Sequence, residues 1–279
     1  YTETENELTV KANKRTFIFS KKDGQLKGVS VDNRKISFAN GPRFIGARRA
    51  DRSLDQFYNH DDEKAKEKDR TYSEFSDAAV FTKLDVKEDG GNLVVTANYK
   101  LGNLDKAQWT INPSGELALD YTYNFSGVVD LMGIRFDYPE DQVISKRWLG
   151  AGPYRVWQNR IHGTQYDVWE NDYNDPIPGE TFTYPEFKGY FGDVSWMNIQ
   201  TKEGTISLTN ETPDAYIGVY QPRDGRDRLL YTLPESGISV LNVIPPVRNK
   251  VNSTDLCGPS SQPKWVNGPQ TGRVIFRFM

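Results

Sequence analysis

The sequence contains few of the residues on which most enzyme and cofactor sites depend. Its one cysteine, Cys257, excludes an intrachain disulfide framework and a multi-cysteine metal site. Its two histidines, His60 and His162, are too few for a multi-histidine zinc site and argue against a catalytic triad. A P-loop, a dinucleotide-binding glycine pattern, an HExxH helix and a nucleophile elbow are all missing. We therefore expect no cofactor and no metal.

The chain also lacks a charge excess and a long apolar run. Its 35 basic and 38 acidic side chains leave a formal net charge of −3, which favours neither nucleic acid nor an anionic membrane as a partner. No apolar stretch approaches the length of a membrane span. The N-terminus begins Tyr1-Thr-Glu-Thr-Glu, without an initiator Met or a signal-peptide pattern, so we expect a segment excised from a larger protein.

Alternating apolar residues predict β-strands along most of the chain. The runs Leu93–Tyr99, Leu117–Phe125 and Val274–Phe278 each alternate apolar and polar positions, as strands with one buried face do. Turn residues at Lys22-Asp23-Gly24, at Asp89-Gly90-Gly91 and at 112–115 predict hairpins between such runs. Many short strands with tight turns indicate a sandwich, and no linker divides residues 1–279 into separate domains.

Two charged stretches are candidates for other roles. Residues 54–75 could hold a helical turn, but the core of the stretch, DDEKAKEKDR, reads as a solvated loop or surface helix. Asp167, Glu170, Asp172 and Asp175 could supply the carboxylate pair of a glycosidase, although acidic residues in a Tyr/Asn/Pro-rich loop are usually solvated or capping.

Aromatic residues gather in WLGAGPYRVWQNRIHGTQYDVWEND, residues 148–172. Rings beside a Gly-Pro turn suit either a sugar-binding platform or a corner of a β-sheet core. We expect Trp148, Trp169 and Trp196 to fill the space between two sheets, with their indole N–H groups bonded to loop carbonyls. Tyr154 and Trp157 follow the turn and are the better candidates for an exposed platform, with Trp265 a weaker one.

Two segments resemble motifs of large β-galactosidases of glycoside hydrolase family 2. WLGAGPYRVWQNR is similar to the W-x-G-x-G-P-x-E-x-Y-x-D-R stretch of that family, and YPEFKGYFGDVSW is similar to P-Q-E-x-G-x-R-x-D-V-x-W. The opening strand-turn-strand and the closing TGRVIFRFM also resemble the family's C-terminal domain, so the likeness spans almost the whole chain.

The departures from these motifs concern charged and aromatic positions. Arg155, Trp157 and Asn159 replace the first motif's Glu, Tyr and Asp, while Phe187 and Phe191 replace the second motif's Glu and Arg. Losing both members of an ion pair together avoids leaving one buried charge without its partner. The segment NSTDLCGP aligns with a loop whose Trp reaches over the substrate in the family, and here Cys257 takes its place beside the matching Asp255.

The resemblance implies an all-β, antiparallel supersandwich similar to galactose mutarotase. It implies a non-catalytic domain that supports a separate catalytic barrel, the partner that holds the active-site glutamates, and that shapes a carbohydrate site. A homo-oligomer is left open. The residues expected at the carbohydrate are Tyr154, Arg155, Trp157, Asp255, Cys257 and Trp265.

Two alternatives remain. One is a stand-alone carbohydrate-binding module that uses Tyr154 and Trp157. The other is a mutarotase-like epimerase, which needs a histidine and a glutamate converging on the sugar, with His162 the only candidate for the histidine.

The last expectation concerns residues 252–259. Pro245-Pro246 cannot continue a central strand, so the chain should leave the sheet there. We expect the segment to turn at Gly258-Pro259 and to lie on the same rim as Arg155 and Trp157.

Overall fold

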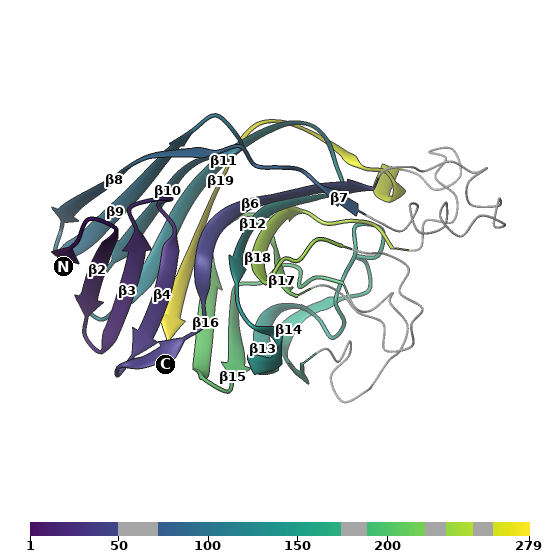
Figure 1. The fold of residues 1–279 in the computed structure, drawn as a ribbon. Helices are drawn as coiled ribbons and strands as arrows, with labels where there is room; N and C mark the ends of the chain where they lie inside the picture. The colour runs from purple at the N-terminus through teal and green to yellow at the C-terminus, as the bar shows by residue number, and fades with distance from the viewer. Residues whose placement is uncertain (50–71, 174–188, 221–232, 248–258) are drawn as a thin grey trace.

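The computed structural model describes residues 1–49, 72–173, 189–220, 233–247 and 259–279. In this part of the chain two large sheets lie face to face, and neighbouring strands run antiparallel (Figure 1). The two termini both lie in the left half of the view in Figure 1. The predicted antiparallel supersandwich is therefore confirmed.

The first sheet has ten strands in the described residues and is in front in Figure 1. Its main order is β1 (Thr2–Glu3), β2 (Glu7–Ala12), β3 (Arg15–Ser20), β4 (Leu26–Val31), β6 (Ala39–Arg49), β12 (Leu131–Asp137), β18 (Ile238–Val243) and β17 (Tyr216–Val219). Two short strands pair beside this path, β5 (Arg34–Ile36) with β4 and β7 (Tyr72–Glu74) with β6.

The second sheet has nine strands in the same part of the chain. Their order is β14 (Gln165–Asp172), β13 (Val143–Gly152), β15 (Trp196–Thr201), β16 (Gly204–Asn210), β19 (Lys264–Phe278), β11 (Leu117–Val129), β10 (Leu104–Ile111), β9 (Asn92–Lys100) and β8 (Val80–Asp89). The described ranges also contain two short 3₁₀ turns, η1 (Glu140–Gln142) and η3 (Pro259–Ser261).

The hairpin turns predicted from the sequence lie where expected. Residues 21–25 connect β3 to β4, Gly90-Gly91 connect β8 to β9, and residues 112–116 connect β10 to β11. At the last turn the Asn112 side chain accepts hydrogen bonds from the backbone N–H groups of Ser114 and Glu116. An asparagine that bonds to the following backbone stabilises a turn locally, which is why this signal could be recognised in the sequence.

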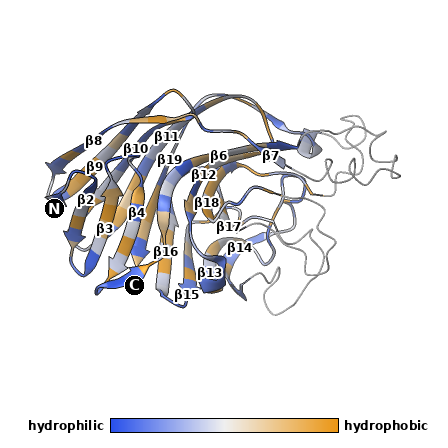
Figure 2. Ribbon diagram, in the orientation of Figure 1, coloured by the Kyte–Doolittle hydropathy of each residue, from blue (hydrophilic) through white to orange (hydrophobic). Residues whose placement is uncertain are grey.

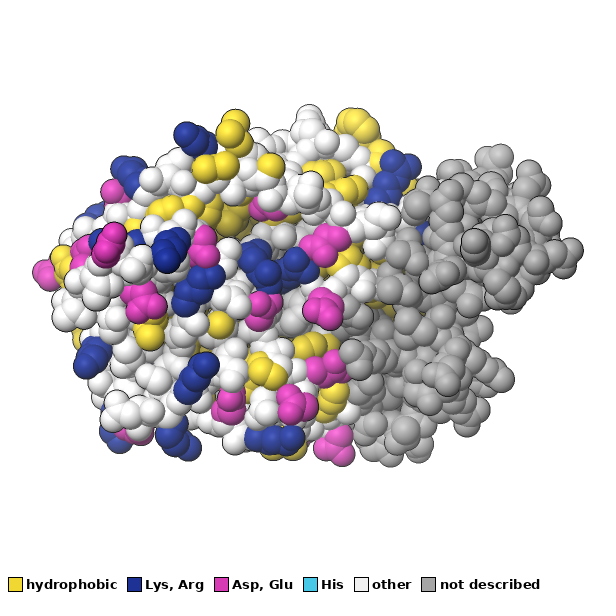
Figure 3. All heavy atoms as spheres, viewed as in Figure 1, with side chains coloured by type: hydrophobic (Ala, Val, Ile, Leu, Met, Phe, Trp, Pro, Cys, Tyr) yellow, Lys and Arg dark blue, Asp and Glu magenta, His cyan; other side chains and the backbone are white. Residues whose placement is uncertain are grey.

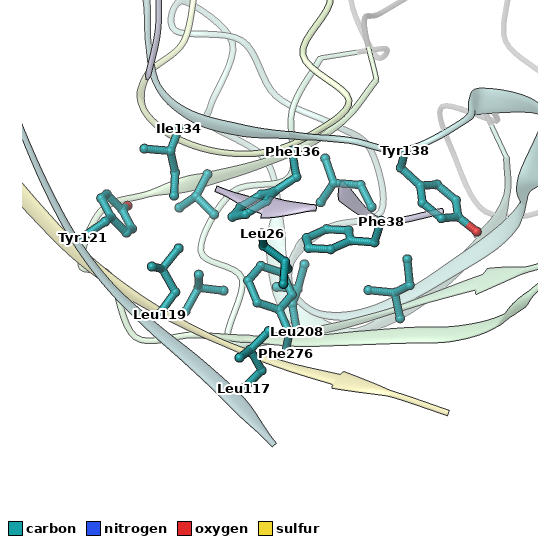
Figure 4. Close-up of a cluster of buried hydrophobic side chains, with 14 of the residues drawn as sticks. Leu26, Phe38, Leu117, Leu119, Tyr121, Ile134, Phe136, Tyr138, Leu208 and Phe276 are labelled. Carbon is teal, nitrogen blue, oxygen red and sulfur yellow. The ribbon is translucent and has the colours of Figure 1, made fainter. Parts of the chain in front are cut away.

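The main core lies between the sheets and is built by alternation along the strands. Apolar and polar positions alternate along many of the strands in Figure 2. Leu117, Leu119 and Tyr121 of β11 point toward Ile134 and Phe136 of β12, across the space between the sheets (Figure 4). All five are at most 1% exposed, and Tyr123 is fully buried as well, so the predicted buried face of residues 117–125 is confirmed through Tyr123.

Residues 50–71, which include His60 and most of the candidate helical stretch, lie outside the described residues. The end of that stretch is not helical, because residues 72–74 form β7. Within the described ranges there is no helix long and apolar enough to cross a membrane.

Candidate functional site

The outer face of the ten-stranded sheet, which points away from the nine-stranded sheet, is covered in part by the segment that contains Trp157, one of the predicted site residues. In β6, Phe44 packs into the main core, whereas Ile45 and Ala47 belong to a second apolar cluster. We call this second group the outer cluster; its buried members are Ile45, Ala47, Tyr72, Leu131, Val156, Trp157, Tyr190, Leu233, Leu241, Ile244 and Val247. Part of this sheet is therefore buried on both faces.

The two motifs that resemble family 2 β-galactosidases meet in space. Val156 and Tyr190 exchange two backbone hydrogen bonds, with N···O distances of 2.8 and 2.7 Å, and the Ala151 N–H donates to Gly192 O at 2.9 Å. A Cβ on Gly189 would lie 1.9 Å from the Val156 carbonyl oxygen, so the close approach requires glycine there. The motif glycine is thus explained by packing between the motifs.

Trp157 is buried, which corrects the expectation of an exposed platform. Its side chain is 2% exposed, and its ring meets Tyr190 edge to face at 5.7 Å between centroids. Burial raises the pKa of Tyr190 well above its ordinary value, because the ionised phenolate would have to leave water. The Gly-Pro turn does start a loop, but that loop folds back onto the sheet, so a sugar cannot stack on Trp157 in this structure.

The paired departures at Arg155 and Phe191 form one contact. The Arg155 guanidinium carbon lies 5.8 Å from the centroid of the Phe191 ring, and Arg155 is 3% exposed. Phe191 in turn meets Trp148 edge to face at 4.8 Å. The two positions are therefore neighbours, but Arg155 is itself a buried charge, so the expectation that the paired change avoids a buried charge is not met. A cation over an aromatic face is stabilised by the ring's quadrupole.

Of the tryptophans expected between the sheets, Trp148 is confirmed. It is fully buried, and its indole N–H donates to Ala151 O at 3.0 Å. Trp169 is half-buried against the main core, with its N–H 3.3 Å from Gln165 O. For Trp196 the expectation is wrong: it alternates with the buried Met197 and lies beside its cross-strand partner Leu149 on the outside of the nine-stranded sheet.

Gln158 and Asn159 bind the chain on both sides of residues 248–258. The Asn159 amide donates to Val247 O and accepts from Val247 N, both at 2.9 Å. The Gln158 amide donates to Ser260 O at 2.8 Å and to Gln262 O at 2.7 Å. The chain does leave the sheet after Val243, as Pro245-Pro246 predicted. Its backbone is bonded to the residues next to Trp157 at Val247 and again at Ser260 and Gln262.

Of the other predicted site residues, Tyr154 and Trp265 are described, and neither belongs to the outer cluster that contains Trp157. Asp255 and Cys257 lie outside the described residues. Tyr154 is half-buried, and its hydroxyl donates to His162 O at 3.1 Å. Trp265 is 72% exposed on β19, where Val128 of β11 is its cross-strand partner. A carbohydrate contact for Tyr154, Asp255, Cys257 or Trp265 stays a prediction.

The acidic residues considered for catalysis lie on an edge strand. Asp167, Glu170 and Asp172 are exposed on β14, and Glu170 is 4.0 Å from the exposed Arg147 on β13. Asp175 lies outside the described residues. Alternation in β14 points Asp167 and Glu170 to opposite faces, so these two do not form a facing pair. Within the described ranges no group of three His, Cys, Asp or Glu side chains could hold a metal ion.

A polar hollow of about 540 Å³ opens beside the outer cluster, and sequence reasoning missed it. Acidic and basic side chains are intermixed on the face that the ten-stranded sheet presents in Figure 3. Arg43 forms an ion pair with Asp137, and Arg135 pairs with Glu74 at 2.6 Å and donates to Glu235 O. The hollow's lining includes Asn40, Arg43, Arg135, Asp137, Glu140 and Tyr220.

A second hollow of about 620 Å³ shares Arg43 and Arg135 with the first.

Tyr220 lines the first, polar hollow. Burial raises the pKa of Tyr220, so its phenol stays a neutral hydrogen-bonding group. The sequence signal that could have indicated this site is an arginine inside an apolar strand pattern, as in PRFIG and GIRF.

The comparisons with known proteins agree with the resemblance of the motifs. Residues 11–250 match the family model described as beta galactosidase small chain. No curated protein matches the sequence at a significant level. The match covers most of the chain and includes both motifs.

Solved structures similar to this one include sugar-acting proteins. A galactose 1-epimerase from Lactobacillus acidophilus is 10% identical, with a TM-score of 0.47. The match covers 100% of this chain and 97% of the epimerase chain. A galactose mutarotase-like protein from Lactobacillus casei is 10% identical, with a TM-score of 0.46 and coverages of 98% and 100%. An α-N-acetylgalactosaminidase from Bifidobacterium bifidum is 11% identical, with a TM-score of 0.45 and coverages of 98% and 36%.

Proposed function

Because the chain belongs to the beta-galactosidase small chain family, we propose that it is the non-catalytic C-terminal domain of a β-galactosidase-like family 2 glycoside hydrolase. In this role it supports the catalytic barrel and shapes the wall of a carbohydrate site. One observation carries the proposal: the first motif and the described part of the second exchange backbone hydrogen bonds and together contribute Val156, Trp157 and Tyr190 to the outer cluster. That is the behaviour of a scaffold more than of a reaction centre.

The described carboxylates support a non-catalytic role. Glycoside hydrolysis needs two carboxyl groups facing each other across the bond, about 5–10 Å apart, with one pKa raised to serve as the acid. Asp167, Glu170 and Asp172 are exposed on β14, at the edge of the nine-stranded sheet.

The two loop anchors support the second part of the role. Gln158 and Asn159 belong to the first motif, and they hold the backbone at Val247, Ser260 and Gln262. The intervening segment carries Asp255 and Cys257, which we propose to lie at the edge of the parent enzyme's sugar site. A scaffold that fixes both ends of a loop reduces the conformational freedom that the loop loses on binding.

Two other functions follow from different residues. A carbohydrate-binding module would have to use Trp265 and Tyr154, because the buried Trp157 offers no platform. A mutarotase-like epimerase would need His162, which is exposed on a turn beside Tyr154, and a glutamate facing the same sugar. The first alternative is favoured by one observation, the 72% exposure of Trp265.

The test begins with the gene that encodes this segment. We would express the whole product, the product without residues 1–279, and residues 1–279 alone, and measure hydrolysis of an aryl β-galactoside. We expect activity in the whole product only, with the deletion inactive because its barrel lacks support. Turnover by the isolated chain that is lost in Asp167→Asn or Glu170→Gln would contradict the proposal.

The alternatives are separated with the isolated chain. Polarimetry on freshly dissolved α-galactose would show catalysed mutarotation that depends on His162 if the epimerase reading were correct. Titration calorimetry of sugar binding to the wild type and to Trp265→Ala tests the binding module. Because this ring is exposed, we expect Trp265→Ala to change the free energy of unfolding by less than about 0.5 kcal/mol. A sugar dissociation constant in the micromolar range, lost in Trp265→Ala, would favour the module.

A further inference from the structure

The strand β8 forms one edge of the nine-stranded sheet, at the left of the view in Figure 1. It spans ten residues, and within the part of the chain that the structure describes it pairs with β9 on one side only. An edge strand of this length carries a row of backbone N–H and C=O groups to which another strand can bind. The side chains along this edge therefore decide which strand it accepts.

The turn between β8 and β9 determines which backbone groups point toward the free edge. Asp89 and Asn92 pair across Gly90-Gly91, and the glycine φ angles of 57° and 83° are those of a type I′ hairpin. The pair that closes such a hairpin is hydrogen-bonded, and pairs with and without hydrogen bonds then alternate along the two strands. The residues whose N–H and C=O groups point to the free edge are therefore Leu84, Val86 and Glu88.

Charges of both signs alternate along the outer face of β8. Lys83 lies 2.8 Å from Asp85, and Lys87 lies 3.2 Å from Asp89. These four side chains are each at least 51% exposed, so every one of them can reach a second partner. Leu84 and Val86, which alternate with them, pack against the main core. We call these four residues the charged row.

The charged row is complementary to itself. When two antiparallel copies of β8 are related by a two-fold axis at Val86, Lys83 of each copy lies opposite Asp89 of the other, and Asp85 lies opposite Lys87. Opposite charges across two strands stabilise the pair, and like charges destabilise it.

The backbone and the charges select the same register. With the axis at Val86, this residue lies opposite its own copy and Leu84 lies opposite Glu88, so all the backbone groups that point outward find a partner. An axis at Asp85 would oppose two aspartates, and an axis at Lys87 would oppose two lysines. The charged row therefore favours the axis at Val86 over both of its neighbours.

The other sheet edges differ from β8. On β14, at the opposite edge of the same sheet, Asp167, Glu170 and Asp172 are accompanied by no basic residue. The end strands of the ten-stranded sheet are short, with two residues in β1 and four in β17. Short strands and charges of one sign are devices that keep edges from pairing. A long edge with alternating charges instead attracts a second copy of itself.

We propose that two copies of this chain associate through β8, in antiparallel register about a two-fold axis at Val86, so that the nine-stranded sheet continues from one copy into the other. Each copy contributes the same strand, as in other symmetric dimers. The proposal concerns the association of the chain and does not depend on the proposed support of a catalytic barrel.

The first experiment measures self-association of residues 1–279 by sedimentation velocity over a range of protein concentrations. One pair of strands buries little surface, so we expect a weak dimer with a dissociation constant of about 100 μM at low salt. Raising the salt concentration to about 0.5 M should weaken the dimer several-fold, because salt screens exposed charges.

The second experiment exchanges the charges. The double variant Lys83→Glu/Lys87→Glu makes the charged row entirely acidic, and Asp85→Lys/Asp89→Lys makes it entirely basic. Each variant alone should associate about tenfold more weakly than the wild type, because like charges then face each other. An equimolar mixture of the two should form mixed dimers about as tight as those of the wild type, since every acidic position then faces a basic one.

A matched control separates the edge from the overall charge. Lys35→Glu/Lys202→Glu makes the same change in net charge as the acidic variant, at two exposed positions outside β8. This control should dimerise as the wild type does.

Amide hydrogen exchange locates the interface in the wild-type chain. The amide protons of Leu84, Val86 and Glu88 should exchange more slowly as the protein concentration rises, whereas those of β14 should not change. The whole parent product, at a concentration where it is monomeric, should leave the same three β8 amides unprotected.

Three results would overturn the proposal. One is a wild-type chain that stays monomeric at about 1 mM in low salt, ten times the expected dissociation constant. Another is an acidic variant that dimerises as tightly as the wild type, which would place the interface elsewhere. The third is protection of the three β8 amides in the monomeric parent product, which would show that another part of the parent covers this edge. The first and third results need no variant, so they remain decisive if a variant fails to fold.

Discussion

The two faces of β6 and β12 differ although they belong to the same strands. On the inner face, Phe44, Ile134 and Phe136 pack into the main core against the nine-stranded sheet. On the outer face, Ile45 and Leu131 are covered by the outer cluster, and further along the same strands Arg43 and Arg135 face the polar hollow. The nine-stranded sheet covers the inner face of these strands along their length. The outer cluster covers only part of their outer face, and the polar hollow lies on the part that it leaves uncovered.

Replacing Trp157 by alanine should have the largest effect. If the outer cluster is a true core, Trp157→Ala should lower the free energy of unfolding by about 3–5 kcal/mol, as the loss of a large buried aromatic does. Phe136→Ala, on the inner face, should fall in the same range. Urea unfolding of both variants makes the comparison, and a cost below about 1 kcal/mol for Trp157→Ala would restore the exposed-platform reading.

The second-largest effect is expected at alkaline pH, which should lower the free energy of unfolding through Tyr121 on the inner face. Burial raises the pKa of Tyr121 from its ordinary value near 10 to about 12. Because the folded state holds the neutral phenol, this stabilisation is complete below about pH 10 and is lost as the pH rises through about 12. A shift of two units corresponds to about 3 kcal/mol.

Unfolding free energies measured between pH 9 and pH 12 check this, with Tyr121→Phe as the comparison. The variant has no phenol to ionise and should lose less stability over that range. Equal losses in the two proteins would show that Tyr121 does not carry the effect.

A smaller loss of stability is expected at Asn159 of the first motif, which is hydrogen-bonded to the backbone of Val247. Asn159→Asp removes the donor to Val247 O and places a carboxylate oxygen beside that carbonyl, which should cost about 1–2 kcal/mol. The exposed Asn267→Asp is the control, since its side-chain oxygen only accepts from Ser126 and an aspartate can still do so. Thermal unfolding compares them, and equal melting temperatures would mean that the Asn159 bonds contribute little.

The sequence by itself determined most of the strands and turns. Alternation in residues 117–125 and 274–278, turn residues such as Asn112, and the break at Pro245-Pro246 depend on the local chain, so they could be recognised without the fold. The two motifs also indicated the family correctly, since residues 11–250 match its model. Burial of Trp148 between the sheets followed from the same patterns.

Only the tertiary structure decided which rings are buried on the outer face and which residues lie opposite each other in neighbouring strands. Trp157 follows a turn that locally exposes it, yet Tyr190 and Val247, distant in sequence, cover it. Arg43 and Arg135 stand opposite each other because the pairing of β6 with β12 sets that register across a long separation in sequence. Local patterns carry the period of a strand, but long-range contacts decide what lies against each of its faces.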